Sequence, residues 1–238
     1  MTVDCVGFIY PDHAAESDYP WAAARLGVEL AVVHIYGTDL HAVPELLDLG
    51  SPARLADGAA LLAPRRPAAV VWACTSGSFV YGPDGAADQV ARLAATAGVP
   101  ASSTSFAFVH ALAALGCARV AVAASYPQDI AELFVGFLAA HDIDVTSMGN
   151  AGIDTAAEVG RLSPEQVAAL AAANDDPGAD ALLIPDTAMH TVAQVETLER
   201  SLGKPVLTAN AVTVWEGLRI AGLPRRAAGL GALFKDER

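Results

Sequence analysis

Short runs of apolar, mostly β-branched residues alternate along the chain with longer Ala- and Leu-rich stretches whose apolar positions recur at helical spacing. This alternation is typical of βαβ units on a parallel sheet. The pattern predicts strands over residues 5–10, 29–35, 69–73 and 99–102 in the first half, and over 119–124, 144–148, 181–184 and 205–208 in the second. It predicts helices over residues 21–26, 43–49, 52–62, 86–97 and 105–115, and then over 128–141, 164–173, 191–201 and 211–220.

The two halves also share landmarks in the same order, which indicates an internal duplication. The matched segments are 6–12 with 120–127, 70–78 with 182–189, and 98–105 with 203–210. The last pair leads in each half into a helix that ends at a glycine, Gly116 or Gly222, as helix C-termini often do. We therefore expect an α/β fold of two pseudo-symmetric, flavodoxin-like halves with parallel sheets. The first half comprises residues 1–115 plus 216–238, and the second comprises residues 116–215.

Ligands of open α/β sheets bind outside the carboxyl ends of the strands. The turns that follow Tyr10, Ala73, Ala124 and Ile184 should therefore face one cleft between the halves, which is the expected active site. At this edge the halves differ in chemistry, because the first carries Cys74 where the second carries Asp186.

Cys74 is the leading catalytic candidate. It stands where a strand gives way to a small-residue turn, and the turn's backbone N–H groups favour an anion or a thiolate. Thr75 and Ser76 add hydroxyl donors, so they are candidate substrate-binding residues. The alternative is a buried structural cysteine followed by a helix cap.

Asp186 is the second catalytic candidate, as an acid or base or as a carboxylate that repels a second carboxylate. Its alternative role is to cap a helix that begins near residues 187–189. Tyr126 could donate to an oxyanion, or it could simply pack at the strand end, and Thr187 is a further substrate-binding candidate. There are weaker candidates as well. His190 could share a helix face with Asp186, and Tyr81 could line the mouth of the pocket. Tyr10 and Asp12 are the first-half equivalents of Tyr126, whereas Cys5 and Cys117 look structural.

Composition narrows the classes of partner. The chain has 238 residues, of which 53% are hydrophobic and 17% charged, with a net charge of −13. It has no basic stripe to neutralise phosphates, so neither nucleic acid nor a membrane surface is expected as a partner. No run is long enough to span a membrane and no basic segment opens the chain, which predicts a cytoplasmic protein. CxxC, HExxH, P-loop and GxGxxG patterns are missing from the sequence, so no metal and no cofactor is expected.

The segment Ala-Cys-Thr-Ser-Gly-Ser at residues 73–78, the Ser-Tyr-Pro at 125–127 and the duplicated layout resemble the Asp/Glu racemase superfamily. The similarity is greatest to its branch of maleate cis-trans isomerases and arylmalonate decarboxylases, and it extends from Val6 to about Gly222. The resemblance implies a cofactor-independent, metal-free enzyme with a cysteine from each half on opposite faces of the substrate. It matches Cys74 to the first cysteine, and Thr75, Ser76 and Tyr126 to the groups that hold a carboxylate or oxyanion.

The chain departs from that pattern at three places. Asp186 stands where the second cysteine is expected, Ala14 stands where an asparagine is expected, and the asparagine expected near residues 152–155 is missing. Three hypotheses follow. The first is a maleate isomerase-like enzyme for a small (di)carboxylic acid with Cys74 as nucleophile. The second is an arylmalonate-type decarboxylase with Cys74 as sole proton donor. The third is a non-catalytic module that binds a small carboxylate. A homo-oligomer is plausible in each case.

Overall fold

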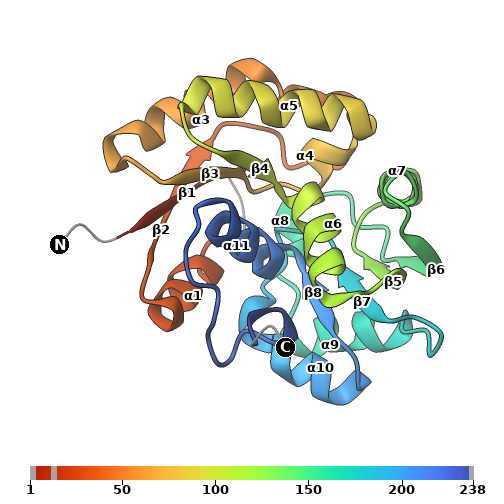
Figure 1. The fold of residues 1–238 in the computed structure, drawn as a ribbon. Helices are drawn as coiled ribbons and strands as arrows, with labels where there is room; N and C mark the ends of the chain where they lie inside the picture. Colours follow the sequence, from red (N-terminus) through yellow and green to blue (C-terminus); the bar gives the residue numbers. More distant parts are fainter. Residues whose placement is uncertain (1–3, 12–14, 236–238) are drawn as a thin grey trace.

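The computed structural model describes residues 4–11 and 15–235, and its two four-stranded sheets correspond to the two halves of the sequence. All pairings are parallel, in the order β2-β1-β3-β4 in the first sheet and β6-β5-β7-β8 in the second (Figure 1). The strands are β1 Cys5–Pro11, β2 Glu29–Ile35, β3 Ala69–Trp72, β4 Ala101–Ser103, β5 Arg119–Ala124, β6 Asp144–Asn150, β7 Ala181–Ile184 and β8 Val206–Thr208. The predicted fold class is confirmed.

The helices connect these strands as βαβ crossovers. They are α1 Asp18–Leu26, α2 Val43–Leu49, α3 Pro52–Leu62, α4 Ser76–Phe79, α5 Gly82–Ala97, α6 Thr104–Leu115, α7 Gln128–Ala139, α8 Ala156–Val159, α9 Pro164–Ala173, α10 Val195–Leu202 and α11 Ala209–Ile220, with 3-10 turns η1 Ala63–Arg65, η2 Val192–Gln194 and η3 Ala232–Phe234. Helices α3 and α5 cover one face of the first sheet, and α1 and α11 lie on the other (Figure 1).

The strand register relates the two halves residue by residue. In each half the first strand pairs with the third in the same register, with Ala69 of β3 and Ala181 of β7 opposite the second residue of the partner strand. Counting five positions onward from these two alanines reaches Cys74 in one half and Asp186 in the other. The thiol and the carboxylate therefore occupy equivalent places at the carboxyl ends of equivalent strands.

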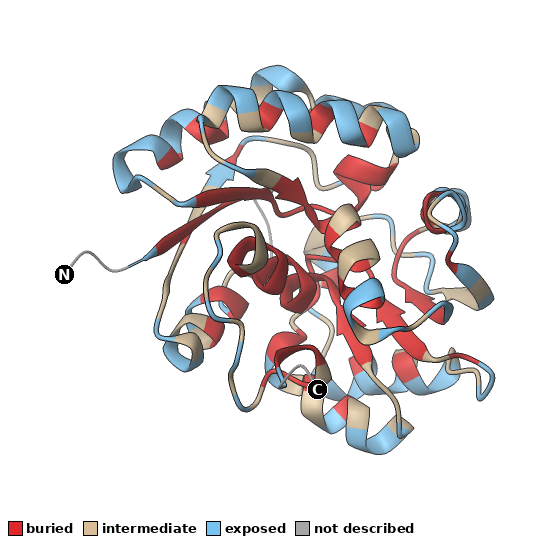
Figure 2. Ribbon diagram, viewed as in Figure 1, coloured by how far each residue is buried: buried red, intermediate tan, exposed pale blue. Residues whose placement is uncertain are grey.

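The last helix of each half packs against the other half. Helix α11 follows the second sheet but lies on the first, where Gly217 approaches so closely that a Cβ would stand 2.7 Å from Val6 and 3.1 Å from Phe8. Helix α6 reaches the second half through Phe108, whose ring centroid is 5.5 Å from that of Phe134 in α7. Helix α11 is almost entirely buried (Figure 2). This exchange fixes the two sheets relative to each other and thereby fixes the cleft between them.

The observed elements differ from the predicted ones mainly at helix ends and in single turns. Helices α4 and α8 were not predicted, because four residues are too short to show a helical period. The helix expected over 191–201 is divided into η2 and α10. The division into residues 1–115 plus 216–238 and 116–215 stays a prediction, and its second boundary lies within α11.

None of the helices among the described residues is both long enough and apolar enough to cross a membrane. The cytoplasmic location and the homo-oligomer stay predictions. Asp12 and Ala14 lie outside the described residues.

Candidate active site

Cys74 lies at the carboxyl end of β3, two residues before α4 begins, and only 4% of its surface is exposed. Its sulfur accepts a hydrogen bond from the backbone N–H of Gly77 at 3.3 Å and lies 3.8 Å from the Ser76 hydroxyl oxygen. Thr75 occupies the N-cap position of α4 but makes no side-chain cap bond. The capping alternative therefore does not explain this segment.

Gly77 is held so that its N–H points at the sulfur. Its carbonyl accepts hydrogen bonds from the Trp72 indole N–H at 3.1 Å and from the Gln89 amide at 2.9 Å. A Cβ at this position would stand 2.9 Å from the Trp72 ring and 3.1 Å from the Cys74 sulfur. Only glycine leaves room for this close approach of backbone, indole and thiol.

Burial raises the pKa of the Cys74 thiol to about 11, although the hydrogen bonds from Gly77 and Ser76 act in the opposite direction. The Asp186 carboxylate raises this pKa further. A pKa above the pH favours the neutral thiol as the resting form of the sulfur near pH 7.

Asp186 lies at the equivalent place after β7 and is likewise buried. One carboxylate oxygen accepts a hydrogen bond from the Ala188 backbone N–H at 2.8 Å, and the other accepts one from the Ser125 hydroxyl. Residues 187–189 form a turn, so the helix required by the alternative capping role of Asp186 does not begin there. The bond to Ala188 fixes the turn and orients the carboxylate toward the cleft.

Cys74 and Asp186 line the same cavity, together with Ser76 and Thr187. The sequence thus identified four residues that the fold brings together. The other lining residues are Pro11, Thr38, Asp39, Leu40, His41, Leu46, Leu49, Ala156 and Ala188. The cavity measures about 30 Å³, far less than the roughly 300–1,000 Å³ of ordinary ligand pockets. A substrate therefore has to widen the site on entry.

Two loops, one from each half, close over this cavity. Leu40 and Thr155 form an isolated antiparallel bridge, and the Ala156 N–H donates to the Asp39 carbonyl at 2.8 Å. The His41 N–H donates to the Asp154 carbonyl, also at 2.8 Å. Residues 39–41 and 154–156 thus form a roof across the two halves.

His41 is a site residue that the sequence reasoning missed. Its Nε2 lies 3.9 Å from an Asp186 carboxylate oxygen, and both side chains are almost fully buried. Its ring stands edge-on to Tyr126, with centroids 5.0 Å apart. No local motif marks His41, but the loop after β2 ends at the same sheet edge as Cys74, and that position was the available signal.

Thr75 and Tyr126 lie behind the cavity, fully buried. The Tyr126 phenol donates to the Pro185 carbonyl at 2.8 Å. Burial raises the pKa of this phenol well above its ordinary value, and the negative charge of Asp186 raises it further. The Thr75 hydroxyl interacts with the Tyr126 phenol, whose pKa it lowers, and has no other hydrogen-bond partner within the described part of the chain. Its O–H is therefore a donor available to a ligand oxygen.

The weaker candidates lie elsewhere. The Tyr10 phenol donates to the Thr187 carbonyl, and the His190 Nδ1 lies 3.1 Å from the Ser17 hydroxyl rather than beside Asp186. Tyr81 does not line this cavity, because its phenol donates to the Leu47 carbonyl. Cys5 is buried within β1 and Cys117 is half-buried after α6, and both lie outside the cavity lining.

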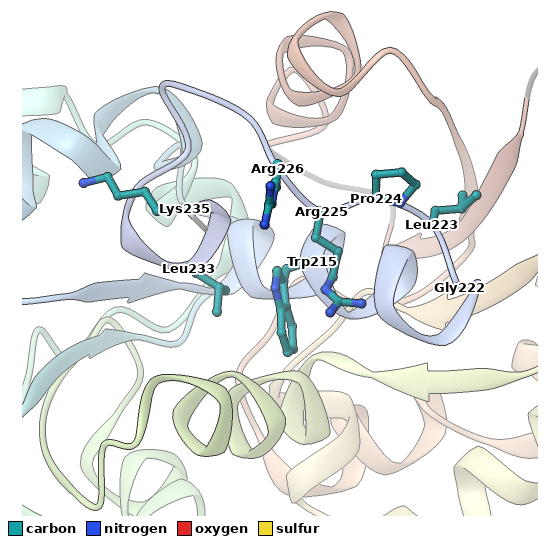
Figure 3. Close-up of a pocket in the computed structure, with 8 residues that line it drawn as sticks. All are labelled: Trp215, Gly222, Leu223, Pro224, Arg225, Arg226, Leu233 and Lys235. Carbon is teal, nitrogen blue, oxygen red and sulfur yellow. The ribbon is translucent and has the colours of Figure 1, made fainter. Parts of the chain in front are cut away.

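The cavity is lined by apolar groups, hydroxyls, two carboxyls, the His41 imidazole and the Cys74 thiol, with no lysine or arginine among the described residues that line it. Nor do the described ranges contain a cluster of three or more His, Cys, Asp or Glu placed to hold a metal. A larger cavity of about 340 Å³ lies at the end of α11, beside Trp215, Arg225, Arg226 and Lys235 (Figure 3). The described residues that line this larger cavity include no cysteine, whereas the smaller cavity contains the candidate Cys74 thiol.

A model of the family described as arylmalonate decarboxylase matches residues 44–234. The chain belongs to this family. It is 32% identical over 168 residues to the arylmalonate decarboxylase of Bordetella bronchiseptica, which covers 68% of this chain and 69% of that one. It is also 32% identical over 182 residues to a maleate isomerase of Nocardia farcinica, covering 74% of this chain and 72% of that one.

A solved structure agrees over the whole fold. It is a liganded mutant of arylmalonate decarboxylase in which a glycine is replaced by cysteine and a cysteine by serine. It has a TM-score of 0.88 and 26% identity, and it covers 98% of this chain and 100% of that one. The resemblance to this branch of the Asp/Glu racemase superfamily is confirmed, and the protein is an enzyme of that branch. The non-catalytic module has no support among the relatives.

Proposed function

We propose that the protein is a decarboxylase for a small substituted malonate, in which Cys74 is the sole proton donor. The observation that carries it is the burial of Cys74 in a cavity shared with Asp186, because both features raise the pKa of its thiol and favour the protonated sulfur. A neutral thiol is ready to give a proton, whereas a nucleophile has to be a thiolate.

The donors around the sulfur suit the intermediate of this reaction. Loss of carbon dioxide leaves an enediolate, whose negative oxygens need preorganised hydrogen-bond donors. The Thr75 and Ser76 hydroxyls are the donors that we assign to them. The Tyr126 phenol joins them when its single O–H turns from the Pro185 carbonyl to the enediolate. Thr187 lies on the opposite side and is assigned a supporting contact with the substrate.

Other residues that line the cavity favour the loss of a substrate carboxylate as carbon dioxide. Leu40, Leu46 and Leu49 give the cavity an apolar side, and Asp186 adds a buried carboxylate. A substrate carboxylate placed there loses its hydration and meets a like charge, and both effects favour its departure as neutral carbon dioxide. Asp186 is thus assigned an electrostatic role rather than that of proton donor to the substrate.

The bonds and charges balance without an added reactant. The bond from the α-carbon to the leaving carboxylate breaks, carbon dioxide departs, and the electron pair remains in the enediolate. The S–H bond of Cys74 then breaks as a C–H bond forms at the α-carbon, and a Cys74 thiolate is left.

The test is to incubate the protein with a series of substituted malonates and with maleate, and to follow both by NMR. We expect carbon dioxide and a monocarboxylic acid from at least one malonate. Conversion of maleate to fumarate without decarboxylation of any malonate would refute the proposal.

Isomerisation is the second candidate, and a specific contact favours it. The Gly77 N–H bond to the Cys74 sulfur would stabilise a thiolate once a substrate or a base removes the proton. The 32% identity to a maleate isomerase supports the same reaction. Fumarate formation in the experiment above would select it.

A further inference from the structure

His41 belongs to the first half of the chain, but its side chain is held by the second. Its Nδ1 lies 3.1 Å from the Ile153 carbonyl oxygen, its ring contacts Tyr126, and its Nε2 faces Asp186 at 3.9 Å. Only 6% of the side chain is exposed. The imidazole is therefore fixed in the cavity that contains the Cys74 thiol.

The contact with Ile153 decides which nitrogen is available. A carbonyl oxygen can only accept, so Nδ1 carries a hydrogen and donates it. In the neutral ring Nε2 is therefore the basic nitrogen, and in the charged ring its N–H points toward a carboxylate. The 3.9 Å between Nε2 and Asp186 is too long for a direct hydrogen bond, and the 30 Å³ cavity has room for a water molecule between them.

The proposed reaction needs such a group, because each turnover leaves Cys74 as a thiolate. The titratable groups that contact the His41 ring are Asp186 and Tyr126, and Asp39 and Cys74 line the same cavity. Two of these are carboxyls, one is the thiol itself, and the phenol is held protonated because burial raises its pKa. His41 carries the only basic side chain among the described residues that line the cavity.

We propose that His41 is the second proton carrier of the site and returns a proton to the Cys74 thiolate after each turnover. Asp186 is a positioning residue that stabilises the charged imidazole. The Nε2–H bond breaks as the S–H bond of Cys74 reforms, directly or through one water molecule, and the neutral imidazole then takes a proton from solvent. This inference rests on the proposed function, in which Cys74 gives its proton to the substrate.

The rival explanation is that His41 only holds the roof closed. Its backbone N–H bond to Asp154 and its Nδ1 bond to Ile153 both tie the two loops together. The variant His41→Asn separates the two roles, because the asparagine amide can donate to the same carbonyl but has no group in place of Nε2. His190→Asn is the matched control, since His190 contacts Ser17 and does not line the cavity.

The first measurement is the time course of product formation with a decarboxylated malonate. In His41→Asn the thiol starts protonated, so we expect a burst of about one product per site. Steady turnover afterwards should be slower than in the unchanged protein by about 100-fold, within the usual range for general acid catalysis. His190→Asn should match the unchanged protein. A first turnover that slows as much as later ones, without a burst, would overturn the proposal.

The second measurement needs no substrate, so it separates this proposal from the proposed function. The group that protonates the thiolate also accepts the thiol's proton in the reverse direction. Alkylation of Cys74 by iodoacetamide near pH 7, followed by mass spectrometry of its peptide, should therefore be several-fold slower in His41→Asn and unchanged in His190→Asn. If no malonate turns over but alkylation depends on His41, the proposed reaction fails and the proton link stands. Equal alkylation in all three proteins would refute the link.

Discussion

The turn after β3 and the turn after β7 occupy equivalent places in two similar half-domains, yet they hold opposite chemistry. The first presents the Cys74 thiol to the Gly77 N–H, and the second fixes the Asp186 carboxylate with the Ala188 N–H and the Ser125 hydroxyl. Both turns use a backbone N–H to orient one side chain toward the cleft. The comparison teaches that the duplicated backbone places two equivalent residue positions at the cleft. The reaction depends on which side chain occupies each position.

Removal of the thiol should have the largest effect. We expect Cys74→Ala to lower the rate of product formation by about 1,000-fold, because it removes the proton donor while the oxyanion donors remain. Cys117→Ala is the matched control, because Cys117 lies outside the cavity. Both should give the circular dichroism spectrum of the unchanged protein. Retention of activity in Cys74→Ala would show that the first turn is not the reactive one.

A second difference between the halves lies in the equivalent helices α6 and α11, because α11 contains a buried carboxylate. Glu216 of α11 is buried among Ser102, His110 and Arg219. Burial alone would raise its pKa, but the hydrogen bonds from His110 and Arg219 outweigh burial and lower the pKa to about 2. Since this lies below the ordinary value of 4.5, the carboxylate stabilises the fold above about pH 4.5, and the stabilisation is lost as the pH falls toward 2.

Glu216→Gln should therefore lower the free energy of unfolding at pH 7 by about 3 kcal/mol, the order of magnitude of that pKa difference. Denaturant unfolding at pH 7 and at pH 3 would measure it, and the difference between the two proteins should shrink at pH 3. The exposed Glu165→Gln should change little at pH 7. A difference that is equally large at both pH values would contradict the assignment.

The third prediction concerns the backbone that holds the thiol. Gly77→Ala should lower the free energy of unfolding by about 2 kcal/mol, because the added methyl group overlaps the Trp72 ring. It should also reduce activity, since it displaces the Cys74 sulfur. Gly136→Ala in α7 is the control, because a Cβ there meets nothing within 4 Å. Thermal unfolding and initial rates would report both effects, and equal results for the two variants would contradict the close approach at Gly77.

The smallest expected effect is on the configuration of the product. Asp186→Cys gives the second turn a thiol of its own, so a proton can reach the α-carbon from the opposite face. We expect the ratio of the two product enantiomers to fall by about tenfold, which corresponds to about 1.4 kcal/mol. Chiral chromatography would measure the ratio. An unchanged ratio would mean that the two turns do not face opposite sides of the substrate.

The sequence predicted the fold well, because buried parallel strands appear as short β-branched runs and the crossover helices show helical spacing. It also pointed to Cys74 and Asp186, because each comes just after a predicted strand, and the structure places both in one cavity. Their catalytic roles stay predictions. It missed His41 because that residue enters the site only through the pairing of residues 39–41 with 154–156. Contacts between loops so distant in the chain leave no local pattern. The sequence left open whether Cys74 acts as a nucleophile or as a proton donor, because the pKa of its thiol depends on burial.

The central claim is that a single neutral thiol on one face of the substrate delivers the proton. Turnover of a prochiral substituted malonate in deuterium oxide tests it most directly, with the product analysed by NMR and chiral chromatography. The account predicts one deuterium at the α-carbon and one predominant enantiomer, with both the label and the product lost in Cys74→Ala. A racemic product, or one formed equally well by Cys74→Ala, would contradict it.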